Sequence, residues 1–332
     1  MECKFLQHGL AIDYDSSVKP CCVWEKDSTW SIQNNITTVN TVTWLNENKD
    51  ISLARDQLKN NQWPIQCANC QWIEETNRQD SVRGSGLFAY KDFAPDDITL
   101  EIRPGNVCNF ACQTCWPAAS SRVMNFYHQA GYIEQVVNQS VQEFDFLLPV
   151  ATRIKQVNLL GGEPFYDKNC LKFLSWAQDN LNSPITIFTN GSVVNHSLLE
   201  TYKHHLDLVF SIDAIGRPSE YIRFGSRWED VYSNYLKCRS LKNVSVGINV
   251  TVSIFNILYL GDLLELILQD PPSKVTFGMA YQPHFTINCV PLSFRPKIIE
   301  QLTAVSIVAL KNNQLSQDQK KNLVIAIRSI IN

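Results

Sequence analysis

The feature that most constrains the fold of this 332-residue chain is a change of sequence pattern near Ile98. From there on, short apolar runs alternate with longer amphipathic stretches, which is typical of βα units around a parallel sheet. The expected strands cover 99–103, 154–160, 185–189, 208–212, 244–252 and 274–279. The expected helices between them cover 123–130, 170–180, 197–204, 228–241 and 258–268. Six units are two short of a full eight-stranded barrel, so the sequence predicts an α/β fold with a partial (β/α)6 TIM-type barrel.

The two ends of the chain differ from this alternating region. Residues 1–95 are rich in Asn, Asp, Trp and Cys, and a helix is expected over 51–61. Two amphipathic helices are expected near the C-terminus, over 296–312 and 316–331. We therefore expect three parts: a small cysteine-rich N-terminal module at 1–95, the partial barrel at 96–290, and C-terminal helices packing on the barrel at 291–332.

The composition excludes several classes of protein. Hydrophobic residues make up 45% of the chain and the net charge is −3, so the chain is not predominantly disordered. The slight acidity argues against general binding of nucleic acid by charge. The sequence has no run of ~18 apolar residues that would cross a membrane, and its N-terminus lacks the pattern of a secretory signal. We therefore expect a cytoplasmic protein without a membrane span.

The cysteines then become the main chemical feature. The chain has eleven cysteines and no expected export signal, and because the cytosol keeps thiols reduced, a disulfide framework is not expected. The odd number also argues against complete pairing. Eight of them are clustered, which is typical of metal binding or thiol chemistry: Cys3, Cys21, Cys22, Cys67, Cys70, Cys108, Cys112 and Cys115. The other three, Cys170, Cys238 and Cys289, stand alone and are expected to be small buried apolar residues.

Three cysteines follow the first expected strand with the spacing C-x3-C-x2-C: Cys108, Cys112 and Cys115. Three thiolates on one short loop can hold three corners of a cubane iron–sulfur cluster. The fourth iron would then be open to a small molecule. A zinc site or simple buried thiols are the alternatives, and a structural zinc would need a fourth Cys or His nearby.

Polar and glycine residues follow the next three strands, where function lies in parallel barrels. They are Gly161, Gly162, Glu163 and Pro164 after the second strand, Thr189 and Asn190 at the third, and Ser211 and Asp213 at the fourth. Two glycines let a backbone approach a ligand closely, and a carboxylate can accept a hydrogen bond from an ammonium group. Each segment alone also fits a turn or a helix cap.

Together these segments resemble the radical S-adenosylmethionine (SAM) enzymes. In that family the C-x3-C-x2-C loop binds a [4Fe–4S] cluster, and the amino and carboxylate groups of SAM chelate the fourth iron. Reduction of the cluster cleaves SAM to a 5′-deoxyadenosyl radical, which abstracts a hydrogen atom from the substrate. One position departs from the family pattern, because Thr114 stands where many members carry an aromatic residue.

The resemblance implies roles for the residues at the strand ends. The Gly161–Pro164 segment matches the family's GGEP loop, which holds the amino group of SAM. Thr189 and Asn190 resemble its TNG segment, and Ser211 and Asp213 resemble its SID segment, whose polar side chains reach the ribose or carboxylate of SAM. Arg223 stands where relatives often carry an arginine, and its planar fork would pair with the SAM carboxylate.

The N-terminal cysteines indicate a second site. Cys67 and Cys70 have the spacing of a metal-ligand pair, and with Cys3 and either Cys21 or Cys22 they could close a zinc site or a fully ligated [4Fe–4S] cluster. This cysteine spacing is compatible with a zinc site and with an iron–sulfur cluster.

This region resembles a twitch module, a short relative of the SPASM domain that carries one auxiliary [4Fe–4S] cluster. Glu74, Glu75, Ser81 and Arg83 belong to the matched pattern. The resemblance implies Cys3, Cys67, Cys70 and one of Cys21 and Cys22 as ligands, with Cys21 favoured, and iron–sulfur over zinc. In relatives the module usually follows the barrel, whereas here it precedes it.

The resemblance implies an oxidoreductase or modifying enzyme that acts on a peptide or a small molecule. A flavodoxin or ferredoxin would supply the electrons. The loop after the sixth strand offers Tyr281, His284 and Cys289 as catalytic candidates. A zinc-binding interaction protein on an inactive barrel is the alternative, but neither the cysteine triad nor Glu163 has been lost. Transfer of a methyl group from SAM is a third hypothesis.

Overall fold

The computed structural model describes residues 1–25, 47–75, 81, 83, 93–136, 139–280, 282, 284–312, 315, 317, 320, 324 and 327. The chain divides into two compact units. The first contains residues 1–108, 134–187 and 202–206, and the second contains 109–133, 188–201 and 207–332.

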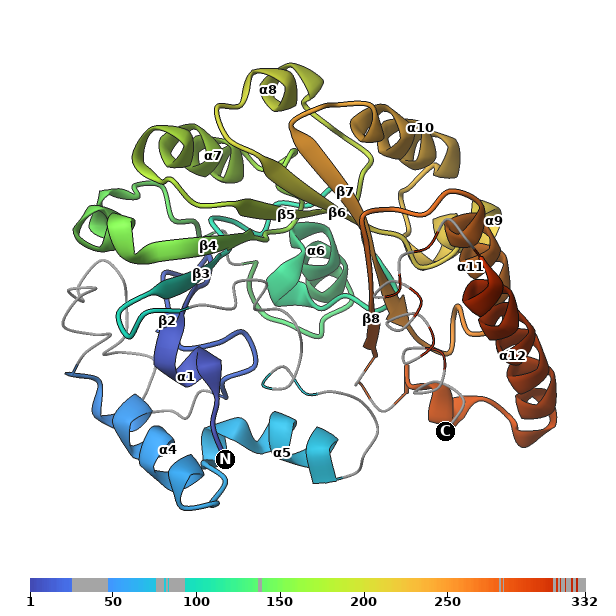
Figure 1. The fold of residues 1–332 in the computed structure, drawn as a ribbon, viewed down its shortest axis with the longest axis horizontal. Helices are drawn as coiled ribbons and strands as arrows, with labels where there is room; N and C mark the ends of the chain where they lie inside the picture. The colour runs from blue at the N-terminus through green and yellow to red at the C-terminus, as the bar shows by residue number, and fades with distance from the viewer. Residues whose placement is uncertain are drawn as a thin grey trace. The chain divides into compact units, whose positions relative to one another are not determined.

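Eight strands form a sheet in the order β2-β1-β3-β4-β5-β6-β7-β8 (Figure 1). Their bounds are Gly9–Ile12 (β1), Val18–Lys19 (β2), Ile98–Ile102 (β3), Ile154–Leu159 (β4), Ile185–Thr189 (β5), Leu206–Ser211 (β6), Val244–Val252 (β7) and Lys274–Met279 (β8). Strands β3 to β8 are the six predicted strands and follow one another in chain order. The described pairs β3–β4, β4–β5 and β7–β8 are parallel. The predicted α/β class, with the strand order of a partial barrel, is confirmed.

The N-terminal region adds two strands to this sheet that the sequence analysis did not predict. Strand β1 pairs in parallel with β3, and β2 pairs antiparallel with β1. All four residues of β1 are buried. Part of residues 1–95 is therefore built into the sheet.

The first unit contains several helices besides these strands. They are α1 (Lys4–His8), α4 (Lys49–Lys59), α5 (Ala68–Glu75) and α7 (Lys168–Asn180), with 3-10 turns η1 (Ile65–Cys67) and η3 (Asp145–Arg153). Helix α4 is the helix predicted over 51–61. It begins earlier because the Asn48 side chain accepts hydrogen bonds from the N–H groups of Asp50 and Ile51 and so caps the first turn.

The core of the first unit lies between the sheet and α7. Leu100 of β3 and Val157 of β4 are fully buried, as are Phe173 and Leu174 of α7. The hydroxyl of Tyr202 donates to the carbonyl of Leu174 at 3.1 Å. This packing holds the ends of β3 and β4, and hence the loops that follow them.

The second unit contains the remaining helices. They are α6 (Ser121–Gln129), α8 (His196–Thr201), α9 (Gly216–Ile222), α10 (Trp228–Arg239), α11 (Leu260–Gln269) and α12 (Arg295–Lys311), with 3-10 turns η2 (Pro117–Ala119), η4 (Ile287–Cys289) and η5 (Leu292–Phe294). Helix α9 was not predicted, and α8 ends three residues earlier than expected. Helices α11 and α12 lie side by side, with Leu263 and Leu302 fully buried (Figure 1).

The C-terminal helix predicted over 296–312 is confirmed as α12. The helix predicted over 316–331 lies almost entirely outside the described residues. None of the helices in the described part of the chain has the length and apolar content that a bilayer span needs.

Candidate functional site

In the first unit, the loop after β4 is bonded to the loop after β3 beside Cys108. The backbone N–H of Gly162 donates to the carbonyl of Gly105 at 3.2 Å. The N–H of Glu163 donates to the carbonyl of Val107 at 2.9 Å. Parallel pairing of β3 with β4 brings the carboxyl ends of both strands to one edge of the sheet. The GGEP segment is therefore in direct backbone contact with the segment that leads into the cysteine loop.

This contact explains the two glycines. A Cβ atom at Gly162 would lie 2.4 Å from the carbonyl atoms of Val107, and one at Gly161 would lie 2.9 Å from the sulfur of Cys170. Both separations are shorter than ordinary van der Waals contacts. The close approach that requires glycine at 162 is thus between two loops of the chain itself.

Glu163 and Pro164 are both buried, and Glu163 has no exposed surface. The Oε1 atom of Glu163 accepts a hydrogen bond from the N–H of Phe165 at 3.3 Å. Nearby, Asp167 caps α7 and also accepts from the N–H of Val107 at 3.1 Å. Asp167 is therefore a further residue that holds the loop before Cys108, and its position ahead of a helix is the sequence signal that identifies it as a cap.

In the second unit, the segment around Cys112 is held by backbone hydrogen bonds on both sides. The N–H of Ala111 donates to the carbonyl of Phe224 at 2.9 Å. The N–H of Gln113 donates to the carbonyl of Ile222 at 2.8 Å. Because Arg223 lies between these two acceptors, the backbone places it opposite Cys112.

Asp213 and Arg223 form an ion pair in this unit. The Nη2 atom of Arg223 lies 2.9 Å from Oδ2 of Asp213, and its Nη1 atom lies 4.0 Å from Sγ of Cys112. Oδ1 of Asp213 accepts the N–H of Thr251 at 2.7 Å, and its carbonyl accepts from the side chain of Asn256 at 2.8 Å. Burial raises the pKa of the Cys112 thiol, and the guanidinium of Arg223 opposes that shift.

The predicted TNG segment is bonded to the start of the cysteine loop. The side-chain amide of Asn190 donates to Oδ1 of Asn109 at 2.9 Å, and the amide of Asn109 donates to Oγ of Ser192 at 2.8 Å. Oγ1 of Thr189 accepts the N–H of Gly191 at 3.0 Å. A φ of +74° at Gly191 explains the glycine of the turn. Asn109, which the sequence analysis did not single out, connects the two segments.

We expect Asn109→Ala to lower the free energy of unfolding by about 1–3 kcal/mol, because it removes the two hydrogen bonds that the Asn109 side chain forms with Asn190 and Ser192. Urea unfolding of the metal-free protein measures this effect. The control is Asn180→Ala on the exposed end of α7, where a change within about 0.5 kcal/mol is expected. Equal effects of the two substitutions would contradict a role for Asn109 in holding the loop.

The other predicted residues occupy varied positions. Cys108, Cys112, Cys115 and Ser211 are half-buried. His284 is exposed, with its ring centroid 4.1 Å from that of Phe285. Tyr281 lies outside the described residues.

Of the three isolated cysteines, Cys170 and Cys238 are buried, as predicted. The same prediction is wrong for Cys289, which is exposed because it ends the short surface turn η4.

The N-terminal cysteines lie close enough to influence one another. Burial raises the pKa of the Cys21 thiol well above its usual value, and the nearby thiols Cys3, Cys67 and Cys70 raise it further, together with Cys22. Burial also raises the pKa of Cys67, to about 12, with Cys3 and Cys70 as neighbours. The thiols of Cys3, Cys21, Cys22, Cys67 and Cys70 are therefore near one another, with Cys70 buried and the other four half-buried.

Cys22 has a different environment. Burial, followed by the charge of Glu101, raises the pKa of the Cys22 thiol, while Arg103 and Lys19 lower it. Arg103 is itself bonded to Glu101 at 3.0 Å and to Asp13 at 2.6 Å. The side chain of Cys22 thus belongs to a buried network of charged groups.

A second set of contacts, made by Arg83, lies next to the N-terminal cysteines. Nε of Arg83 donates to Oε1 of Glu74 at 3.0 Å, and Ser81 also donates to Glu74. Nη1 of Arg83 donates to the carbonyl of Glu2 at 2.7 Å, next to Cys3. The positive charge of Arg83 acts to lower the pKa of Cys3, although burial dominates and raises it.

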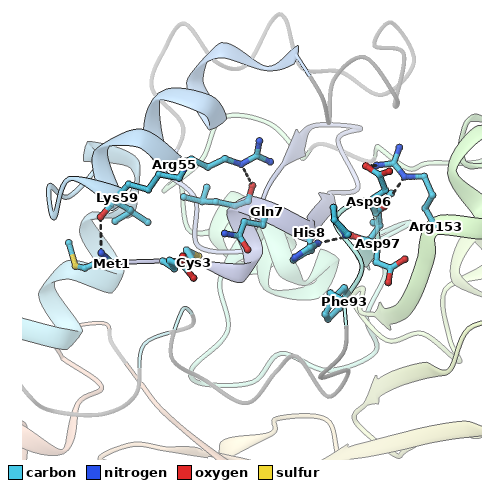
Figure 2. Close-up of a pocket in the computed structure, with 15 residues that line it drawn as sticks. Met1, Cys3, Gln7, His8, Arg55, Lys59, Phe93, Asp96, Asp97 and Arg153 are labelled. Carbon is cyan, nitrogen blue, oxygen red and sulfur yellow. Dashed lines mark hydrogen bonds and ion pairs between the residues drawn. The ribbon is translucent and has the colours of Figure 1, made fainter.

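Cys3 also borders a cavity of about 560 Å³ in the first unit (Figure 2). Helices α1 and α4 and the segment before β3 line it, and Arg55 and His8 face it. Burial lowers the pKa of His8, whose ring stacks on Phe93 with centroids 4.8 Å apart. The volume is in the range of small-molecule sites.

Four cysteine thiols are the donor set of a structural zinc ion and also of a [4Fe–4S] cluster. A zinc ion needs its four ligands at ~2.0–2.3 Å from one point. In the described part of the chain, no three or more His, Cys, Asp or Glu side chains are arranged around a single metal ion.

Comparison with known proteins found no matching family model and no similar curated protein. Among solved structures, the chain is similar to anSMEcpe with bound AdoMet, at 16% identity and a TM-score of 0.48, covering 64% of this chain and 61% of that one. It is also similar to Streptococcus suis SuiB bound to S-adenosylmethionine, at 14% identity and a TM-score of 0.42, covering 65% and 46%. A structure of TYW1 with a lysine-pyruvate adduct has 15% identity and a TM-score of 0.43, covering 77% and 87%. The chain thus spans less than two thirds of the length of anSMEcpe and SuiB.

Proposed function

We propose that this chain is a radical SAM enzyme in which Cys108, Cys112 and Cys115 hold a [4Fe–4S] cluster with one open iron. The observation that carries the proposal is the backbone contact between Glu163 and Val107, 2.9 Å long, which joins the GGEP loop to the cysteine loop. The GGEP loop and the cysteine loop resemble two different motifs of the family, and this contact makes them neighbours in space. When bound, the cluster and SAM supply the radical that abstracts a hydrogen atom from the substrate.

The residues of the chain bind and orient these groups. Glu163, buried in the GGEP segment beside the cysteine loop, would accept a hydrogen bond from the ammonium group of SAM, as the resemblance implies. Ser211, half-buried at the end of β6, is the proposed contact for the SAM ribose or carboxylate. Asn109 and Asn190 fix the loop that carries the cysteines.

We propose that the N-terminal group binds a second [4Fe–4S] cluster through Cys3, Cys21, Cys67 and Cys70. The charged neighbours of the Cys21 thiol are Cys22, Cys3, Cys70 and Cys67, whereas those of Cys22 are Glu101, Arg103 and Lys19. This cluster would accept the electron left on the substrate or relay the reducing electron. The resulting enzyme is a cytoplasmic oxidoreductase of a peptide or small molecule, with a flavodoxin or ferredoxin as the electron donor.

The test is anaerobic purification and cluster reconstitution, with iron, sulfide and zinc counted per chain. About eight irons are expected for two [4Fe–4S] clusters, together with an EPR signal of the reduced protein that shifts when SAM is added. About four irons and one zinc would keep the enzyme and assign zinc to the N-terminal group. Zinc alone, without a SAM-sensitive signal, would refute the radical SAM proposal and favour a zinc-binding interaction protein.

A further inference from the structure

The ion pair between Asp213 and Arg223 is built into the second unit rather than left at its surface. The side chains of Asp213 and Arg223 are only 3% and 12% exposed. Asp213 is fixed by the N–H of Thr251 and, through its carbonyl, by Asn256. A buried charge pair needs such additional hydrogen bonds to offset its desolvation. The orientation of Asp213, and through it that of Arg223, is therefore determined by the fold.

Arg223 is also held against Cys112 by the backbone. The hydrogen bonds that flank the two residues, from Ala111 to Phe224 and from Gln113 to Ile222, prevent the segments from separating. The guanidinium thus spans a carboxylate at 2.9 Å and a sulfur at 4.0 Å. The positive charge of Arg223 therefore contacts both the ligand sulfur and the carboxylate of Asp213.

We propose that the Asp213–Arg223 pair sets the reduction potential of the cluster that Cys112 helps to hold. Arg223 is a positioning residue whose charge favours the reduced cluster, and Asp213 partly cancels that charge. The inference rests on the proposed function, and it assigns Arg223 to the cluster sulfur rather than to the SAM carboxylate.

The physical reason is the charge added on reduction. One electron from the external carrier enters the cluster, the carrier is oxidised by one electron, and no atoms are exchanged. Net charge and hydrogen bonds to the sulfurs are main determinants of cluster potential. A cation near a ligand sulfur therefore raises the potential, and an anion lowers it.

The test is a redox titration of the SAM-sensitive EPR signal, carried out without SAM. Arg223→Met is expected to lower the midpoint potential, because it removes the cation and leaves Asp213. Asp213→Asn is expected to raise it, because it leaves the cation without its counter-charge. Each shift should reach about tenfold in the reduction equilibrium, which is about 59 mV for one electron. The double variant should return toward the wild-type potential.

Arg223→Lys keeps the charge and is expected to restore most of the wild-type potential. The control is Arg227→Met, since Arg227 is exposed and is paired only with Asp230, at 3.7 Å, among the described residues. The second cluster serves as an internal reference whose potential should not move.

Opposite shifts distinguish an electrostatic role from a structural one. Shifts of the same sign in Arg223→Met and Asp213→Asn would overturn the inference, because loosening of the site would affect both alike. An unchanged potential with weakened SAM binding in Arg223→Met would assign the arginine to the SAM carboxylate instead. If the wild-type protein gives no SAM-sensitive signal, it is the proposed function that fails.

Discussion

Cys21→Ala should lose about four irons per chain, whereas Cys22→Ala should retain the full complement. The two cysteines are neighbours in the sequence, but the thiol of Cys21 has Cys3, Cys70 and Cys67 among its charged neighbours besides Cys22. The charged neighbours of Cys22 are Glu101, Arg103 and Lys19. Iron and sulfide analysis of the reconstituted proteins measures the difference.

The first cluster provides the control within each variant. Its SAM-sensitive EPR signal should persist in Cys21→Ala, because the C-x3-C-x2-C loop is untouched. Cys289→Ala, at an exposed position, should bind as much iron as the wild-type protein does. Loss of iron in Cys22→Ala with retention in Cys21→Ala would exchange the roles of the two cysteines.

Gly162→Ala is expected to damage the first cluster site and the stability of the fold together. The new Cβ would lie 2.4 Å from the carbonyl of Val107, which also accepts the N–H of Glu163. Neither loop can move without breaking this contact. Overpacking of this kind costs about 1–3 kcal/mol, so we expect a loss of that size in unfolding free energy and a loss of the SAM-sensitive EPR signal.

Gly278→Ala is the matched control, because a Cβ at Gly278 in β8 would meet nothing within 4 Å. Its expected effect is neutral or slightly stabilising, by about 0.5–1 kcal/mol, since alanine restricts the unfolded chain. Wild-type stability and an intact signal in Gly162→Ala would show that the two loops can separate, and would remove the observation on which the proposed function rests.

The strands that were predicted best are those whose apolar runs are sharply bounded. Strands β5, β7 and β8 have the predicted limits, because the apolar pattern within each of these segments is enough to mark where the strand begins and ends. Strands β1 and β2 were missed, since they are only four and two residues long. Residues 9–12 become a strand through pairing with residues 99–102, and no local pattern reports such a distant partner.

Helix α9 was missed for a similar reason. It has seven residues, includes Pro218 and starts at Gly216, whose φ of +59° is unfavourable for other residues. Its formation depends on the packing of Ile222 into the core rather than on helix propensity. That short helix decides the position of Arg223, which follows it directly.

The sequence by itself determined the α/β class, the order of the βα units and the residue types of the two cysteine groups, because hydrophobic periodicity and ligand spacing are local properties. Only the tertiary structure decided which side chains meet. It paired Arg223 with Asp213 and Cys112, joined Asn190 to Asn109, and gave Cys21 and Cys22 different charged neighbours. Such contacts depend on how distant segments are brought together by the sheet, and on which side of the backbone each side chain then faces.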